Sequence, residues 1–400
     1  MSTVIGPNAT IAVAGAGTMG AGIALVAAQA GHPVILFDSS SKALEKARKS
    51  HEIHFSKFIE KGKITSDKAA MVLGRLQYVE SLVDISSAGL VIEAVIEDLS
   101  VKQDLFRRLE KIIAHDTILA SNTSSLSITS IAAACSQPGR CLGIHFFNPA
   151  TLMPLVEIIP GLQASFQTTE AVVKLITAWG KTTVLAKDTP GFIVNRVARP
   201  FYGEAIRIYE EQWLDLPYGI KGMATIDWAL REHGGFRMGA FELMDLIGND
   251  INYTVTETVW KQSYHDPRYK PSLTQKRMVE AGRLGRKTEL GYYDYSVETH
   301  KVTPDTDPVR GAKIMRRILS MLINEAADAL YYQVASAEDI DLAMTNGVNY
   351  PKGLLQWCDE IGADEIVREL DGLHNEYHEE RYRCSVLLRK FAREGLRFRS

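Results

Sequence analysis

The alternation of short apolar runs with amphipathic segments in the N-terminal half predicts strands separated by helices. A first apolar run, 11–14, leads through a glycine-rich turn and an alanine-rich segment to a second run, 34–38. Further runs predict strands at 76–79, 90–94, 117–120, 141–144, 155–159 and 182–187, and apolar stripes predict helices at 41–62, 100–114 and 170–179. This rhythm is typical of an α/β domain built on a parallel sheet.

The pattern changes after Asp188. From there on the apolar positions recur at helical spacing, and no strand alternates with the helices. We therefore place a domain boundary near 188, with an N-terminal domain at 1–188 and an all-helical remainder.

An internal repeat divides the helical remainder. The segments 226–229 (Ile-Asp-Trp-Ala) and 340–343 (Ile-Asp-Leu-Ala) match, and 195–205 aligns with 316–326. From each aspartate the same offsets lead to further matches, which are Gly239 with Gly353, Asp245 with Asp359 and 247–248 with 361–362. We expect two tandem all-α domains, copy 1 at 189–295 and copy 2 at 312–400, joined by a linker at 296–311 that is rich in threonine, proline and aspartate.

The glycine-rich turn after the first strand carries the clearest chemical signal. It reads Gly15-Ala16-Gly17-Thr18-Met19-Gly20, where Gly15 permits a tight turn, Gly17 permits close approach of a pyrophosphate and Gly20 permits close packing of helix on strand. Asp38 ends the second strand, where its carboxylate can accept hydrogen bonds from an adenosine ribose and would repel a 2′-phosphate. The segment predicts a Rossmann-type domain that binds NAD rather than NADP.

Composition excludes several classes of partner. The chain has 400 residues, 46% of them hydrophobic, and a net charge of −3, which argues against nucleic acid or an anionic membrane as the main partner. No apolar run approaches the roughly 20 residues that span a bilayer, and residues 1–10 lack the features of a signal peptide. Its four cysteines are scattered without metal-type spacing. We expect a cytoplasmic protein without a structural metal.

Polar residues gather where predicted strands end, which is where open α/β sheets bind ligands. Residues 121–125 (Ser-Asn-Thr-Ser-Ser) form either a turn with a helix cap or a hydroxyl-lined pocket. His145 ends another strand, and Glu157 lies on the strand that follows. A single histidine is more often structural than catalytic, but this placement makes an oriented His–Glu pair plausible.

The predicted helix at 41–62 and the residues just after it contain several lysines. A solvated helix face explains them without any function, whereas a dock for a phosphorylated substrate is the alternative interpretation.

Together, these motifs resemble the L-3-hydroxyacyl-CoA dehydrogenases in order and spacing. They are the 15–20 fingerprint, 121–125, His145-Phe146-Phe147-Asn148-Pro149, Glu157 and 189–196 (Thr-Pro-Gly-Phe-Ile-Val-Asn-Arg). The duplicated helical domain, with 335–341, 347–351 and 379–383, is similar to the bacterial 3-hydroxyadipyl-CoA or 3-hydroxybutyryl-CoA dehydrogenase branch, which is used in phenylacetate breakdown and shares the chemistry of β-oxidation in fatty acid metabolism. This chain has a shorter segment between its repeats than that branch.

The resemblance implies a role for each matched position. His145 would be the general base, oriented by Glu157, and Ser124 and Asn195 would hydrogen-bond the substrate in a cleft between the domains. Asp38, Glu97, Lys102 and Asn122 would lie along the NAD molecule together with the glycine turn. Lys57, Lys61 and Lys63 become candidates for contacts with the phosphates of CoA.

Several alternatives remain open at this stage. The enzyme could act on a free 3-hydroxy acid, or the chain could be a non-catalytic NAD-binding protein. An adipyl substrate would need a cation for its distal carboxylate, and Arg196, Arg199 or Arg237 could supply it or could form structural salt bridges. Copy 2 has Arg316 where copy 1 has Asn195, so we expect copy 2 to be structural. The chain could then be a monomer with an internal pseudo-dimer, or a homodimer.

Overall fold

The computed structural model describes residues 5–6, 8–296 and 302–399. The chain divides into two compact units, Met1–Thr189 and Pro190–Ser400. Within the expected linker, residues 297–301 lie outside the described residues. Of the described helices, none is both long and apolar enough to cross a membrane.

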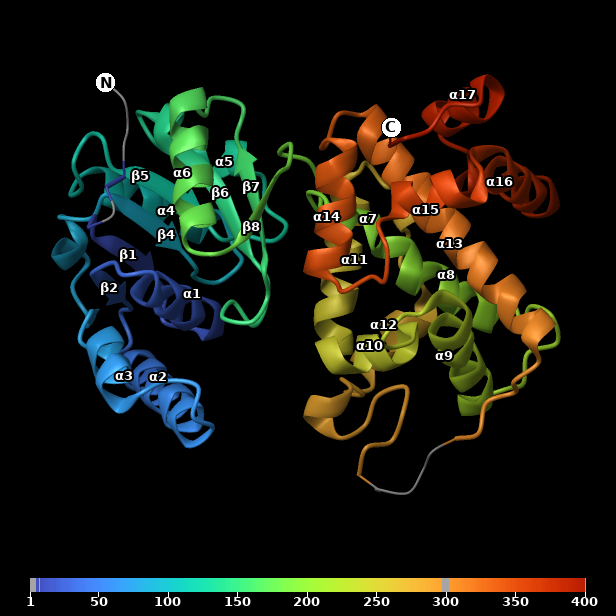
Figure 1. Ribbon diagram of the computed structural model, residues 1–400, viewed down its shortest axis with the longest axis horizontal. Helices are drawn as coiled ribbons and strands as arrows, with labels where there is room; N and C mark the ends of the chain where they lie inside the picture. Colours follow the sequence, from blue (N-terminus) through green and yellow to red (C-terminus); the bar gives the residue numbers. More distant parts are fainter. Residues whose placement is uncertain (1–4, 7, 297–301, 400) are drawn as a thin grey trace. The chain divides into compact units, whose positions relative to one another are not determined.

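The first unit is built on an eight-stranded sheet (Figure 1). In chain order its strands are β1 (Ile11–Ala14), β2 (Val34–Phe37), β3 (Leu76–Val79), β4 (Leu90–Glu93), β5 (Ile118–Ser121), β6 (Cys141–Phe146), β7 (Leu155–Pro160) and β8 (Thr182–Leu185). Their order across the sheet is β3-β2-β1-β4-β5-β6-β7-β8. The strands lie close to the predicted apolar runs because buried parallel strands read as continuous apolar segments.

Helices cover both faces of this sheet, since successive side chains of a strand point to opposite sides. Ile11 and Val13 face one apolar core and Ala12 and Ala14 the other. The first core is closed by α1 (Thr18–Gln29), α2 (Ser41–Glu60), α3 (Ser66–Leu73) and α6 (Phe166–Ala178), and the second by η1 (Leu82–Ile85), α4 (Leu99–Glu110) and α5 (Ile128–Ala132). A 3₁₀ turn, η2 (Pro138–Arg140), precedes β6.

One pair of strands departs from the expected parallel arrangement. Strands β1 to β6 run parallel to one another, but β7 pairs with β6 in the antiparallel direction, and β8 is parallel to β7. The connection between β6 and β7 has too few residues to hold a crossover helix, so the chain returns directly alongside β6. The sheet is therefore mostly, not wholly, parallel.

The second unit is built of helices, and among its described residues extended pairing is limited to isolated bridges of Leu290 with Gly285 and Asp294 (Figure 1). The elements of copy 1 are α7 (Val194–Val197), α8 (Arg199–Glu210), α9 (Ile220–Gly234), α10 (Ala240–Ile247), α11 (Asn249–Gln262), η3 (Pro267–Tyr269), α12 (Leu273–Glu280) and η4 (Arg286–Thr288). Those of copy 2 are α13 (Pro308–Tyr331), α14 (Ala337–Gly347), α15 (Leu354–Ile361), α16 (Ala363–Tyr377), η5 (Glu380–Tyr382) and α17 (Val386–Glu394). Helix α13 begins at Pro308, inside the expected linker 296–311, because Asp307 caps its first turn.

The repeated aspartates explain why the repeat is visible in the sequence. Asp227 accepts hydrogen bonds from the first backbone N–H groups of α10 at 2.9 and 3.0 Å, and Asp341 does the same for α15 at 2.8 and 3.0 Å. A Cβ atom on Gly239 or Gly353 would collide with the corresponding aspartate, at 2.2 and 2.3 Å. Each copy thus caps a helix with a distant carboxylate, which only glycine can approach.

The two copies contact each other through reciprocal ion pairs. Arg196 of copy 1 donates from Nε to Glu325 of copy 2 at 2.7 Å, and Arg317 of copy 2 donates from Nε to Glu204 of copy 1 at 2.6 Å. The alignment of the repeats pairs Arg196 with Arg317 and Glu204 with Glu325. The contact is therefore isologous, as in a twofold dimer, although both copies belong to one chain.

Candidate active site

The predicted His–Glu pair forms at the junction of β6 and β7. His145 and Glu157 lie directly opposite each other in the antiparallel register, and His145 Nδ1 is 2.6 Å from Glu157 Oε2. Both side chains are buried, with 5% and 0% of the residue exposed. The direct return of β7, which had not been expected, is what brings the two residues together.

This geometry defines the chemistry that the histidine can perform. Because the Glu157 carboxylate accepts a hydrogen bond at Nδ1, it favours the tautomer in which Nδ1 carries the proton and Nε2 has the basic lone pair. A buried carboxylate at this distance also stabilises the imidazolium that forms when Nε2 takes up a proton. The ring of Phe147 lies 4.5 Å from the imidazole, centroid to centroid, and covers part of it.

The glycine turn has the shape that a dinucleotide requires. Gly15 has a φ of 111°, and a Cβ there would lie 2.6 Å from the Ala94 carbonyl oxygen. A Cβ on Gly20 would meet the Gly15 oxygen at 1.8 Å, so the helix approaches the turn too closely for a side chain. At Gly17, by contrast, nothing lies within 4 Å, which leaves room at the N-terminus of α1 for a pyrophosphate. Thr18 and Met19 begin that helix.

Asp38 is tied to the same turn. Its Oδ2 accepts a hydrogen bond from the Ala16 N–H at 2.7 Å, and its Oδ1 accepts one from the Ser40 N–H at 2.9 Å. The carboxylate is therefore held at the C-terminal end of β2, beside the glycine turn. This is the place from which an acidic side chain contacts an adenosine ribose in such folds.

Glu97 organises the polar segment 121–125. Its Oε1 accepts hydrogen bonds from the Thr123 hydroxyl at 2.6 Å, the Ser125 hydroxyl at 3.0 Å and the Ser124 N–H at 3.1 Å. Although burial opposes it, the charge of Lys102 and these hydroxyl groups lower the pKa of Glu97. The segment is thus a turn ordered by one carboxylate, and it holds Ser124 in a defined position.

Lys102 is buried, with 1% of its surface exposed, and its ammonium group is engaged by two carboxylates. Its Nζ lies 2.6 Å from Glu93 and 3.2 Å from Glu97. Glu93, which also accepts a hydrogen bond from the Ser121 hydroxyl at 2.6 Å, was not among the predicted site residues. Its position directly after an apolar run was the available signal. Lys102 thus links Glu97, another residue predicted to lie along NAD, to Glu93 on strand β4.

The remaining predicted residues fall in different places. The Oδ1 atom of Asn122 accepts a hydrogen bond from the Phe146 N–H at 2.9 Å, which fixes the end of β6 next to His145. Asn195 lies on α7 in the helical unit. Lys57, Lys61 and Lys63 are exposed, and Lys63 lies over the ring of Phe58. Because these lysines are exposed, both interpretations of them stay open, a solvated helix face and a contact with the phosphates of CoA.

The three arginines considered for a substrate carboxylate differ sharply. Arg196 is bound by Glu325, and Arg199 is buried, donates to the Thr256 hydroxyl at 3.1 Å and has a pKa lowered by that burial. Arg237 is exposed. Two of the three therefore have structural partners.

Comparison with protein families agrees with this geometry. The model of the 3-hydroxyacyl-CoA dehydrogenase NAD-binding domain matches residues 10–189, and that of the C-terminal domain of the same family matches residues 191–295 and again 314–398. The chain belongs to the 3-hydroxyacyl-CoA dehydrogenase family. It is accordingly an oxidoreductase whose cofactor is NAD, and the family's C-terminal domain occurs twice in it.

Individual members of the 3-hydroxyacyl-CoA dehydrogenase family are similar over most of this chain. The 3-hydroxyadipyl-CoA dehydrogenase of Escherichia coli is 38% identical, over 96% of this chain and 97% of its own length. A crystal structure of 3-hydroxybutyryl-CoA dehydrogenase from Escherichia coli superposes with a TM-score of 0.90 and 37% identity, covering 97% of this chain and 98% of the other. The human mitochondrial hydroxyacyl-coenzyme A dehydrogenase is 40% identical over 71% of this chain and 90% of its own.

Proposed function

We propose that this enzyme oxidises a short-chain L-3-hydroxyacyl-CoA to the 3-oxoacyl-CoA, with His145 as the general base. The observation that carries the proposal is the buried pair of His145 and Glu157, 2.6 Å apart on neighbouring strands. The pair lies in the same unit as a glycine turn shaped for NAD. Family membership supports the assignment, since the motifs in both units match the family's domains.

Each residue then has a defined task. His145 Nε2 takes the proton of the substrate's 3-hydroxyl group, and Glu157 stabilises the imidazolium that results. When NAD is bound, its nicotinamide accepts the hydride that leaves C3. Ser124 and Asn195 donate hydrogen bonds to the substrate near its hydroxyl and thioester carbonyl. Asp38 binds the adenosine ribose, while Asn122, Glu97 and Lys102 keep the cofactor side of the site in place.

We favour an acyl group without a distal carboxylate, as in 3-hydroxybutyryl-CoA, over the acyl group of 3-hydroxyadipyl-CoA, because two of the three candidate arginines are already bound by other residues. Arg196 and Arg199 already have partners, so only Arg237 of the three candidates could bind a second carboxylate without breaking a described contact. The adipyl thioester remains the second candidate, because an Escherichia coli relative that is similar over nearly the whole chain bears that name. That substrate would place the enzyme in phenylacetate breakdown. Lys57, Lys61 and Lys63 supply positive charge for the CoA phosphates in either case.

The deciding experiment measures steady-state NADH formation with the two thioesters at matched concentrations. A higher kcat/KM for the butyryl thioester is expected. A large advantage for the adipyl thioester would reverse the substrate assignment and direct mutagenesis to Arg237. Turnover of free 3-hydroxybutyrate but of neither thioester would refute the acyl-CoA assignment.

The catalytic assignment is tested with His145→Gln, using His115→Gln as the matched control because His115 is exposed. We expect His145→Gln to lower kcat by about 10²–10⁴-fold, since general base catalysis contributes that much. NADH binding, measured by fluorescence titration, should be unchanged in both variants. Retention of most activity in His145→Gln would remove His145 from the mechanism.

We also propose that the chain acts as a monomer in the cytoplasm. The reciprocal ion pairs between its two helical copies reproduce a twofold contact within one chain, which supports a monomer. All four cysteines are buried and free, as expected in a reducing compartment. Sedimentation equilibrium distinguishes the monomer from a homodimer.

A further inference from the structure

The short helix α7, which carries Asn195, is packed largely against the second copy. It contacts α13 and α14 of copy 2 as well as α8 and α11 of its own copy. A helix of four residues contains a single turn and has little stability of its own, so its position depends on what surrounds it. Copy 2 therefore supplies much of the support for the segment on which Asn195 lies.

Arg196, the neighbour of Asn195, joins this helix to copy 2 by an ion pair. Its Nε donates to Glu325 Oε1 at 2.7 Å, and its guanidinium carbon lies 5.7 Å from the centroid of the Tyr332 ring at the end of α13. Glu325 is fully buried, and it also accepts from the Tyr269 hydroxyl at 2.5 Å and from Arg268 at 3.1 Å. A carboxylate so enclosed cannot change partners without leaving a buried charge unpaired.

We propose that Glu325 of copy 2 is a positioning residue for the dehydrogenase reaction. It anchors Arg196 and thereby sets the place of Asn195 on α7. The second copy is in this sense part of the active enzyme, although it carries Arg316 where copy 1 has Asn195. The inference rests on the proposed function, because that function assigns Asn195 to the substrate.

The pseudo-symmetry of the chain provides a control at Glu204, the residue of copy 1 that aligns with Glu325. Glu204 has similar surroundings to Glu325, because it accepts from Arg317 Nε at 2.6 Å and from the Tyr382 hydroxyl at 2.8 Å and is 3% exposed. One difference is that Arg317 also contacts Glu211, at 2.9 Å. The arginine that Glu204 binds, however, adjoins Arg316 on α13 and not Asn195. Loss of either carboxylate disturbs a buried cluster between the copies, but only Glu325 binds an arginine that lies on α7.

The experiment compares Glu325→Gln with Glu204→Gln in the full chain. We expect both variants to lose stability towards urea, Glu204→Gln the less of the two, because Arg317 keeps Glu211 as a partner. Only Glu325→Gln should raise the KM for the acyl-CoA and lower kcat/KM, by about 10²-fold, as a misplaced substrate contact can. The KM for NAD should stay the same in both, because the glycine turn lies in the other unit. A simple loss of folded enzyme would lower kcat in both variants and leave both KM values unchanged.

Amide hydrogen exchange gives a readout that does not depend on turnover. Glu325→Gln should accelerate exchange at 194–198, and Glu204→Gln should instead accelerate it around residue 317 of α13. If either substitution prevents folding, the milder pair Tyr269→Phe and Tyr382→Phe replaces it, since each removes one hydroxyl donor from the same two carboxylates.

The outcomes separate the two claims. Unaltered exchange at α7 in Glu325→Gln, or an equal loss of kcat/KM in both variants, overturns the role of Glu325 while His145→Gln still tests the reaction itself. If the wild-type enzyme oxidises neither thioester, the proposed function fails, and the role of Glu325 in placing the substrate fails with it.

Discussion

The two helical copies show which parts of a repeated domain must be kept for folding and which for chemistry. Both keep an aspartate that caps a distant helix, Asp227 and Asp341, and both keep one half of a reciprocal Arg–Glu contact. They differ at the position that the proposed function assigns to the substrate, Asn195 against Arg316. Copy 2 has retained the framework but not the residue that the proposed function assigns to the substrate.

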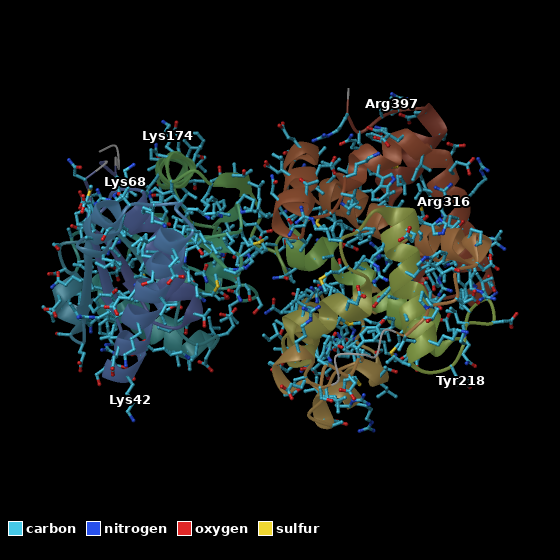
Figure 2. The ribbon with its side chains drawn as sticks, turned by 60° about the horizontal axis from the view of Figure 1, so that its bottom comes forward. Lys42, Lys68, Lys174, Tyr218, Arg316 and Arg397 are labelled. Carbon is cyan, nitrogen blue, oxygen red and sulfur yellow. The ribbon has the colours of Figure 1, made fainter. Side chains whose placement is uncertain are left out.

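A second difference concerns the shape of the helix at that position. In copy 1, Pro200 follows α7 and lies in the first turn of α8, whereas the aligned residue of copy 2, Met321, lies in the middle of the continuous helix α13. Proline lacks the N–H that an uninterrupted helix needs and is tolerated in a first turn. The break at Pro200 thus separates the segment that bears Asn195 from the helix after it. Arg316, labelled in Figure 2, instead lies within α13. Its guanidinium is 3.9 Å from the Glu365 carboxylate.

The test with the largest expected effect exchanges the two residues at which the copies differ, Asn195 and Arg316. Asn195→Arg should lower kcat/KM by at least about 100-fold, because a bulky cation replaces a neutral hydrogen-bond donor beside the substrate. Arg316→Asn, the reverse change in copy 2, should leave kcat/KM unchanged, as it removes only a partly exposed ion pair with Glu365. Steady-state kinetics with the preferred thioester measures both. Equal effects of the two changes would mean that the copies do not differ in function.

The next test concerns the helix break. Met321→Pro should lower the free energy of unfolding by about 3 kcal/mol or more, because it removes a hydrogen bond from the interior of α13. Pro200→Ala should lower it by at most about 1 kcal/mol, through added freedom of the unfolded chain. Urea denaturation followed by circular dichroism gives both values. A cost for Pro200→Ala as large as that for Met321→Pro would show that the break in copy 1 is essential for folding.

The last test concerns the capping aspartates and the way in which stability depends on pH. Burial, with a contribution from Glu242, raises the pKa of Asp227 to about 7 in the folded state, against an ordinary value of 3.8. A raised pKa means that the folded state favours the protonated acid, so its contribution to stability is lost as pH rises from about 4 to about 7. The pKa of Asp341 is also raised by burial, but Arg399, 3.2 Å away, opposes the shift.

Asp227→Asn should therefore flatten the fall in unfolding free energy between pH 4 and pH 7, and Asp341→Asn should flatten it less. Denaturation midpoints measured at several pH values in that interval test the difference. An unchanged slope in Asp227→Asn would show that Asp227 does not titrate there.

Local signals in the sequence were sufficient for most of the first unit. The strand at 11–14, the glycine turn and Asp38 are contiguous, and their geometry follows from nearest-neighbour rules for strands, turns and helix termini. The N-cap of α2 is likewise local, because the Ser40 side chain accepts from the Ala43 N–H three residues ahead. The offsets that revealed the repeat recur because each capping carboxylate needs a glycine at the approach of its helix.

Contacts between distant residues could not be read in this way. Arg196 was considered as a partner for a substrate carboxylate, but Glu325, 129 residues away, binds it. Glu97 was predicted to lie along NAD, and its bonds to Thr123 and Ser125 were not foreseen. Such pairings depend on where the chain brings separate elements together, which no local pattern encodes.

The sequence by itself determined the class of the N-terminal domain, the NAD fingerprint, the duplication of the helical domain and the identity of His145 and Glu157 as a candidate pair. These follow from periodicity and from residue types at fixed spacing, because they depend on neighbours along the chain. Only the tertiary structure decided that β7 runs antiparallel to β6, which places the Glu157 carboxylate on His145 Nδ1. It also decided that each copy supplies the glutamate that binds an arginine of the other copy. A buried charge needs a partner of opposite sign, and the partner here comes from a distant part of the sequence.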